Sequence, residues 1–231
     1  MNTESIQWQS VYQSLDEKGY AVLPALLSKE VCLQFTQGYA DSSLYRSIIN
    51  MKRYRFGEGE YKYFSYPLPP QIQTLREKLY APLAIIANQW NEKLSLPEKY
   101  PDHHHELIEL CKLKNQVRPT PLILQYQKGG YNTLHQDLYG DVYFPFQVVF
   151  ALSQQGVDYE GGEFVLVEQT PRAQSRAEVI NLNQGDALVF TTNFRPVKGT
   201  RGYYRTTMKH GISKLRSGVR YALGIIFHDA L

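Results

Sequence analysis

The chain has 231 residues, 43% of them hydrophobic, and carries a formal net charge of +3. This size suits one medium-sized domain with a sizeable core, and so small a charge does not by itself indicate a nucleic-acid partner. Two cysteines cannot form a disulfide framework, and the longest apolar run, about residues 81–87, is too short to span a bilayer. We therefore expect a cytoplasmic protein without a membrane partner.

The first half of the sequence has mainly helical patterns. Apolar residues recur at helical spacing over residues 8–15, and Gly19 is a typical helix end. A short strand is expected at residues 20–23. It is followed by a helix at about residues 28–35, which Ser28 can cap.

The clearest helix begins after Pro69-Pro70. Its apolar side chains form a single stripe, made of Ile72, Leu75, Leu79, Leu83, Ile86 and Trp90. Such a stripe needs a large apolar surface to pack against, which a sheet later in the chain would supply. A shorter helix is expected at about residues 106–113.

After Pro121 the apolar spacing changes from helical to alternating. We expect short strands, separated by Gly-rich or polar turns, at residues 122–127, 132–136, 147–152, 163–167, 177–182, 187–191, 203–210 and 219–227. Eight short strands at this spacing indicate a closed or double-sheet architecture. The sequence thus predicts an α+β fold and one domain over residues 1–231. Within it, residues 1–118 are mainly helical and residues 119–231 form a double-stranded β-helix (a jelly-roll, cupin-like barrel), with the helices packed on its larger sheet.

The tripeptide His135-Gln136-Asp137 is the strongest candidate for chemistry. On a strand, residues i and i+2 project to the same face, so this imidazole and carboxylate would converge. His210, at the end of a distant predicted strand, would complete a set of two histidines and one carboxylate. In a jelly roll these two strands are neighbours. This set leaves coordination positions open, as O₂ activation at non-haem Fe(II) requires.

A second cluster, His104-His105-Glu106, lies where a helix is expected to begin. Residues i and i+2 of a helix lie about 200° apart around its axis, so they cannot share one metal ion. We interpret this cluster as a polar helix start.

Arg220 lies ten residues after His210, on the next predicted strand. Its guanidinium could form a two-pronged salt bridge with one end of a dicarboxylate while a keto-acid end chelates the metal. Ala222 and Gly224 share its face and leave room for a small ligand, whereas the intervening residues 221, 223, 225 and 227 would face the helices.

These motifs resemble the Fe(II)- and 2-oxoglutarate-dependent oxygenase superfamily. The stretch LILQYQKGGYNTLHQD, residues 122–137, is similar to the strand-turn-strand of AlkB-type nucleic-acid demethylases. The segments HQDLYGDVYFPFQVV, GGEFVLVEQTPRAQSRAEV, RPVKGTRGYYR and GIIFHDA resemble more closely a bacterial oxygenase family described as acting oxidatively on methylated, damaged nucleic acid. The resemblance covers roughly residues 116–230.

The resemblance implies roles for five residues. His135, Asp137 and His210 would be the iron ligands, Arg220 would bind the distal carboxylate of 2-oxoglutarate, and Tyr126 would donate a hydrogen bond to this cosubstrate, or else be a core tyrosine. The implied cofactors are Fe(II) and 2-oxoglutarate, with O₂ as co-reactant and ascorbate as a candidate supporting reductant.

Two positions depart from the AlkB-type pattern. The second pocket arginine of those enzymes is Ile226 here, and their asparagine two residues before the tyrosine is Leu124. Cosubstrate binding must therefore differ in detail from that of AlkB-type enzymes.

The substrate stays open at this point. No acidic residue lies between Asp186 and Asp229, and Arg201, Tyr204 and Arg205 in this stretch are candidate contacts for single-stranded or damaged nucleic acid. The segment from Lys52 to Arg55 mixes cations and a ring in the same way. The alternatives are a protein (prolyl-type) hydroxylase, a small-molecule hydroxylase and a non-catalytic metal-binding module, in which Arg220 would have no purpose. The sequence does not indicate an oligomeric state.

Overall fold

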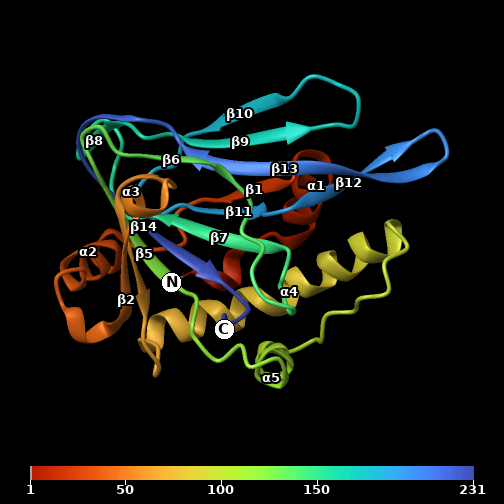
Figure 1. Ribbon diagram of the computed structural model, residues 1–231, viewed down its shortest axis with the longest axis horizontal. Coiled ribbons are helices and arrows are strands. Elements are labelled where there is room, and N and C mark those ends of the chain that lie inside the picture. The colour runs from red at the N-terminus through yellow and green to blue at the C-terminus, as the bar shows by residue number, and fades with distance from the viewer. Residues whose placement is uncertain (1) are drawn as a thin grey trace.

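The computed structural model describes residues 2–231 and contains two antiparallel β-sheets with helices against the larger one (Figure 1). The α-helices are α1 (Trp8–Lys18), α2 (Lys29–Gly38), α3 (Met51–Tyr54), α4 (Pro70–Lys93) and α5 (His104–Leu113). The strands are β1 (Tyr20–Leu23), β2 (Tyr45–Asn50), β3 (Gly57–Glu58), β4 (Glu60–Phe64), β5 (Leu122–Gln127), β6 (Tyr131–His135), β7 (Phe146–Ala151), β8 (Tyr159–Gly161), β9 (Phe164–Gln169), β10 (Arg176–Ile180), β11 (Ala187–Thr191), β12 (Phe194–Gly199), β13 (Gly202–Ile212) and β14 (Leu215–Ile226).

Strands of the second half are shared between the two sheets. The larger sheet has the order β1-β11-β7-β14-β5-β4-β2, with β8 beside β14, and the smaller has the order β10-β9-β13-β6-β3, with β12 beside β13. The chain therefore crosses repeatedly from one sheet to the other, for example between β5 and β6, between β10 and β11, and between β13 and β14. One apolar cluster, which includes Phe164, Leu188 and Ala222, takes residues from both sheets.

The helices cover the other face of the larger sheet. All six stripe residues of α4 are at most 1% exposed, and the ring of Trp90 lies 4.8 Å from that of Phe146 in β7. Burial of each such side chain contributes about 1.5–3 kcal/mol. A buried ion pair, 2.7 Å between Arg76 and Asp229, also joins α4 to the residues after β14. The predicted packing of this helix on a sheet is confirmed.

The eight predicted strands of the second half are present, and so is β1. The expectation of a mainly helical first half was incomplete, because β2 and β4 pair with each other and extend the larger sheet next to β5. These strands lie toward the edge of that sheet, and β2 has no buried side chain. Their apolar alternation is correspondingly weak, which is why the sequence pattern did not reveal them.

Among residues 2–231, no helix combines the length and the apolar character that crossing a bilayer requires.

Candidate functional site

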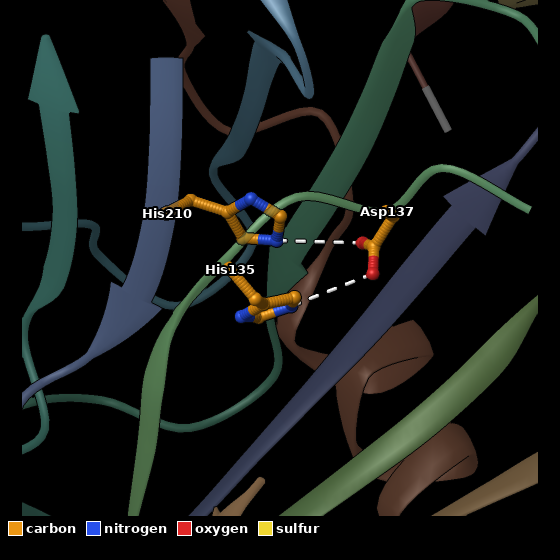
Figure 2. A group of neighbouring side chains, drawn as sticks. All are labelled: His135, Asp137 and His210. Carbon is orange, nitrogen blue, oxygen red and sulfur yellow. Dashed lines mark ion pairs between the residues drawn. The ribbon is translucent and has the colours of Figure 1, made fainter. Parts of the chain in front are cut away.

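Antiparallel pairing of β6 with β13 places His135 directly opposite His210. The predicted adjacency of these two strands is thus confirmed. The chain leaves the sheet after His135, and Asp137 turns back toward both rings (Figure 2). Nε2 of His135 lies 3.5 Å from Oδ1 of Asp137, and Nε2 of His210 lies 3.4 Å from Oδ2. The three candidate ligand atoms lie within 4.8 Å of one another, which suits binding to a single ion.

Neighbouring polar groups orient these side chains. Nδ1 of His135 lies 2.7 Å from the carbonyl oxygen of Thr133, which leaves Nε2 directed at the centre of the site. Gln147, from β7, donates a hydrogen bond of 3.0 Å to Oδ2 of Asp137. Gln136 points the other way and donates to the carbonyl oxygens of Asn193 (2.8 Å) and Met208 (3.0 Å). The tripeptide is therefore held on both sides.

The protonation states of Asp137 and His210 also favour metal binding. Burial works to raise the pKa of Asp137, but its hydrogen bond with His210, the charges of both histidines and the Gln147 amide outweigh burial and hold that pKa well below its ordinary value. Burial lowers the pKa of His210, against the opposing effect of Asp137. The site thus presents a carboxylate and a neutral imidazole, the forms that bind metal ions.

A cavity of 340 Å³ adjoins the His135, Asp137 and His210 side chains and also contains Arg220. Arg220 is 3% exposed, and its side chain forms no ion pair or hydrogen bond with any of residues 2–231. Its guanidinium lies 5.7 Å from the ring centroid of Tyr126 and 6.0 Å from that of Tyr159. A buried cation without a counter-charge costs several kcal/mol, so this cavity favours an anionic ligand.

The faces of β14 agree with the sequence analysis. Ala222 and Gly224 line the cavity together with Arg220. Leu223, Ile225 and Phe227 belong to the apolar cluster under the helices, and Tyr221 packs against it. On β14, the residues that follow Arg220 along the cavity wall are therefore small.

Tyr126 lies in the same cavity and is fully buried. Burial raises the pKa of Tyr126 to about 12, opposed by the Arg220 charge and the nearby Asn132 amide. Asn132 does not reach hydrogen-bonding geometry, and the hydroxyl has no hydrogen-bond partner among residues 2–231. A neutral hydroxyl therefore stands beside the guanidinium, able to donate to an anion.

With this geometry established, comparison with known proteins identifies the family. A family model described as "Oxygenase, catalysing oxidative methylation of damaged DNA" matches residues 59–230. The chain belongs to this oxygenase family. An uncharacterized protein of Mycobacterium tuberculosis, from strain H37Rv and from strain CDC 1551 / Oshkosh, is 48% identical over 167 residues, 72% of each chain.

Solved structures share the fold of this oxygenase. A prolyl-4-hydroxylase from Pseudomonas putida superposes with a TM-score of 0.56 at 12% identity, over 97% of this chain and 100% of that one. A prolyl hydroxylase from Trichoplax adhaerens gives 0.56 at 15% identity, over 99% and 96%. The 2-oxoglutarate-dependent epimerase SnoN from nogalamycin biosynthesis gives 0.58 at 12% identity, over 96% and 82%.

The predicted substrate residues Arg201, Tyr204 and Arg205 do not line the cavity of the oxygenase. They lie on the hairpin of β12 and β13, which projects away from the rest of the smaller sheet (Figure 1). Arg201 is nine residues from His210 on β13, roughly 30 Å at about 3.3 Å per residue. Their contact with substrate stays a prediction and would require a ligand that extends well beyond the cavity.

The cavity also contains residues that the sequence analysis did not single out. Tyr61 and Tyr63 from β4, Tyr139 and Gln147 all line it. Gln147 could have been noticed as the one polar residue in the apolar strand FQVVFA. Tyr61 and Tyr63 are two residues apart and so share one face of β4. Their place in the cavity could have been predicted only if β4 had been recognised as a strand.

The cluster at His104 belongs to the helix start, as expected, although His104 itself is not a surface residue. Glu106 accepts a hydrogen bond of 3.0 Å from the backbone N–H of His103 and so caps α5. His104 is 5% exposed, with Nε2 2.8 Å from the carbonyl oxygen of Phe227. Burial and the charge of Arg76 lower the pKa of His104 to about 3, so this ring is a neutral, structural hydrogen-bonding group.

The contact between Gln147 and Asp137 gives a direct test of the site. We expect Gln147→Leu, which keeps the side-chain volume and removes the donor, to weaken Fe(II) binding about 10- to 100-fold, as is typical when a partner of a metal ligand is lost. Anaerobic competition with a chelator measures this affinity. Gln13→Leu, at an exposed position of α1, is the matched control and should leave Fe(II) affinity unchanged. Equal affinity in both variants would remove Gln147 from the site.

Proposed function

We propose that this protein is an Fe(II)- and 2-oxoglutarate-dependent dioxygenase that hydroxylates a C–H bond of its substrate. The observation that carries the proposal is the unpaired, buried cation of Arg220 in the same cavity as His135, Asp137 and His210. Two imidazoles and one carboxylate suit non-haem iron, and the isolated guanidinium suits a dicarboxylate. A purely metal-binding module would have no use for Arg220.

Each residue then has a defined task. His135, Asp137 and His210 would hold Fe(II), which when bound with 2-oxoglutarate and O₂ would supply the oxidation of the substrate, with 2-oxoglutarate converted to succinate and CO₂. Arg220 would bind the distal carboxylate, and Tyr126 would donate a hydrogen bond from its neutral hydroxyl to the same ligand. Ala222 and Gly224 leave the space this ligand needs, and the enclosing sheets exclude water.

We assign the architecture in the same way. Strands β5, β7, β11 and β14 lie in the larger sheet and β6, β9, β10 and β13 in the smaller, which supports a double-stranded β-helix within residues 119–231. The helices share one apolar cluster with the larger sheet, which supports a single domain over residues 1–231.

For the substrate, we propose an N-methylated base of nucleic acid. The family description refers to damaged DNA. Hydroxylation of an N-methyl group gives a hemiaminal that releases formaldehyde, so oxidation would remove a methyl group and not add one. The proposed reaction is therefore oxidative demethylation.

Arg220 provides the test of the cosubstrate. Arg220→Ala should weaken 2-oxoglutarate binding to the Fe(II)-loaded protein by about 2–4 kcal/mol, roughly 30- to 1,000-fold, with little effect on Fe(II) binding. Arg220→Lys should recover part of the affinity, because a point charge replaces the fork. Anaerobic calorimetry measures both. Arg216→Ala, an exposed arginine on the same strand, is the control. Unchanged affinity in Arg220→Ala would assign the carboxylate to another cation.

Product analysis tests the substrate. The protein is incubated with Fe(II), 2-oxoglutarate and ascorbate, and with N-methylated oligonucleotides, peptide pools or metabolites in turn. We expect succinate and formaldehyde to form together with the methylated oligonucleotide, and not with its unmethylated counterpart. If peptides or metabolites stimulate succinate formation and the methylated oligonucleotide does not, the substrate is a protein or a small molecule and the proposed nucleic-acid substrate is wrong.

A further inference from the structure

The segment Lys52–Phe56, called here the basic-aromatic lip, lies at the edge of the cavity. Its five side chains are exposed, whereas Met51 before it is fully buried and anchors it in the apolar cluster between the sheets. Three of the five are cations, Lys52, Arg53 and Arg55, and none forms an ion pair with another of residues 2–231. The lip is thus a small patch of positive charge whose three cations form no ion pair within residues 2–231.

Two aromatic rings stand among these cations. Tyr54 is 55% exposed and Phe56 is 46% exposed, and their rings are stacked at 5.6 Å with an interplanar angle of 18°. Phe56 also lines the cavity that contains His135 and Asp137. The pair therefore forms an exposed aromatic surface that begins at the cavity wall and continues onto the outside of the molecule.

Hydrogen bonds fix the lip to the strand that carries His135. The carbonyl oxygen of Phe56 accepts hydrogen bonds of 2.8 Å from both the backbone N–H and the hydroxyl of Thr133, and the carbonyl oxygen of Thr133 contacts His135. Gly57, with φ of 142°, pairs with Asn132, and a Cβ there would lie 2.2 Å from the carbonyl oxygen of Tyr131. Only glycine permits this close approach, so the backbone that carries Phe56 is held against the strand of His135.

We propose that the basic-aromatic lip binds single-stranded nucleic acid and stacks the base next to the one that enters the cavity. Phe56 and Tyr54 supply the stacking surface, while Lys52, Arg53 and Arg55 neutralise phosphates. This inference rests on the proposed nucleic-acid substrate and gives it a location. The combination of rings with unpaired cations favours nucleic acid over an acidic peptide, because a peptide would use the cations and leave the stacked rings exposed.

The lip differs in position from the β12–β13 hairpin that the sequence also suggested. Figure 1 shows α3 beside β6, at the opposite side of the molecule from the projecting end of that hairpin. A short strand centred on the cavity would therefore contact the lip first.

Binding of a short, fluorescently labelled single-stranded DNA, with one N-methylated base beside a 2-aminopurine, tests this inference on the full chain with Fe(II) under anaerobic conditions. Phe56→Leu keeps apolar bulk and removes the ring; it should weaken binding roughly 5- to 150-fold and abolish stacking-induced quenching of 2-aminopurine. Phe56→Tyr, which restores a ring, should bind and quench like the original protein. This pair separates loss of stacking from loss of folding.

The charges are tested by salt dependence. Lys52→Ala and Arg53→Ala should each reduce the slope of log K against log salt by about 0.7, the share of one phosphate on a single strand. Lys78→Ala, an exposed lysine on α4, is the matched control and should leave the slope unchanged.

The outcomes distinguish the lip from the substrate class. No oligonucleotide binding by the unaltered protein at low salt would overturn both the nucleic-acid substrate and the lip. A second outcome is normal oligonucleotide binding in Phe56→Leu and Lys52→Ala with weakened binding in Arg205→Ala. This result would keep nucleic acid as the substrate but place its binding surface on the β12–β13 hairpin, and it would contradict the role proposed for the lip. Equal binding of an acidic peptide, with no response to Phe56→Leu, would also overturn it.

Discussion

The register between β6 and β13 is the constraint on which the site depends. It sets His135 opposite His210, and the chain's exit from the sheet then brings Asp137 to both rings. A shift by one residue would turn the inward side chains of either strand to the other face. The hydrogen bonds of Gln136 to the neighbouring Asn193 and Met208 carbonyls oppose such a shift, so the residue between the two ligands helps to hold the register.

Several residues that line the cavity are unfavourable for the stability of the fold. Arg220 is a buried cation without a counter-charge, and the small residues Ala222 and Gly224 beside it contribute little packing. His210 adds a buried Nδ1 that has no hydrogen-bond partner among residues 2–231. In a core built only for stability such features are destabilising, and their concentration in one cavity is typical of a ligand site. The larger sheet compensates on its other face, where the α4 stripe is fully packed.

Much of this was predictable because its signals are local. Alternation along β14 predicted which of its residues face the cavity and which face the helices. The spacing of the apolar stripe predicted helix α4 and its buried side. Non-local features were harder to predict. The edge strand β2 buries no side chain and so leaves little pattern, and Gln147 reaches Asp137 only because β7 lies in the opposite sheet. Distance along a strand is a further non-local quantity: Tyr204 shares a face with His210 but lies about 20 Å from it, and alternation alone does not encode that separation.

The proposed function requires one small molecule to contact the metal and Arg220 together. Anaerobic calorimetry with 2-oxoglutarate and with glutarate, each with and without Fe(II), tests it most directly. Glutarate keeps a carboxylate for Arg220 but lacks the keto oxygen needed to chelate. We expect Fe(II) to tighten the binding of 2-oxoglutarate strongly and the binding of glutarate much less. Arg220→Ala should weaken the binding of both ligands. Metal-independent binding of 2-oxoglutarate, with an affinity equal to that of glutarate, would contradict the proposed function.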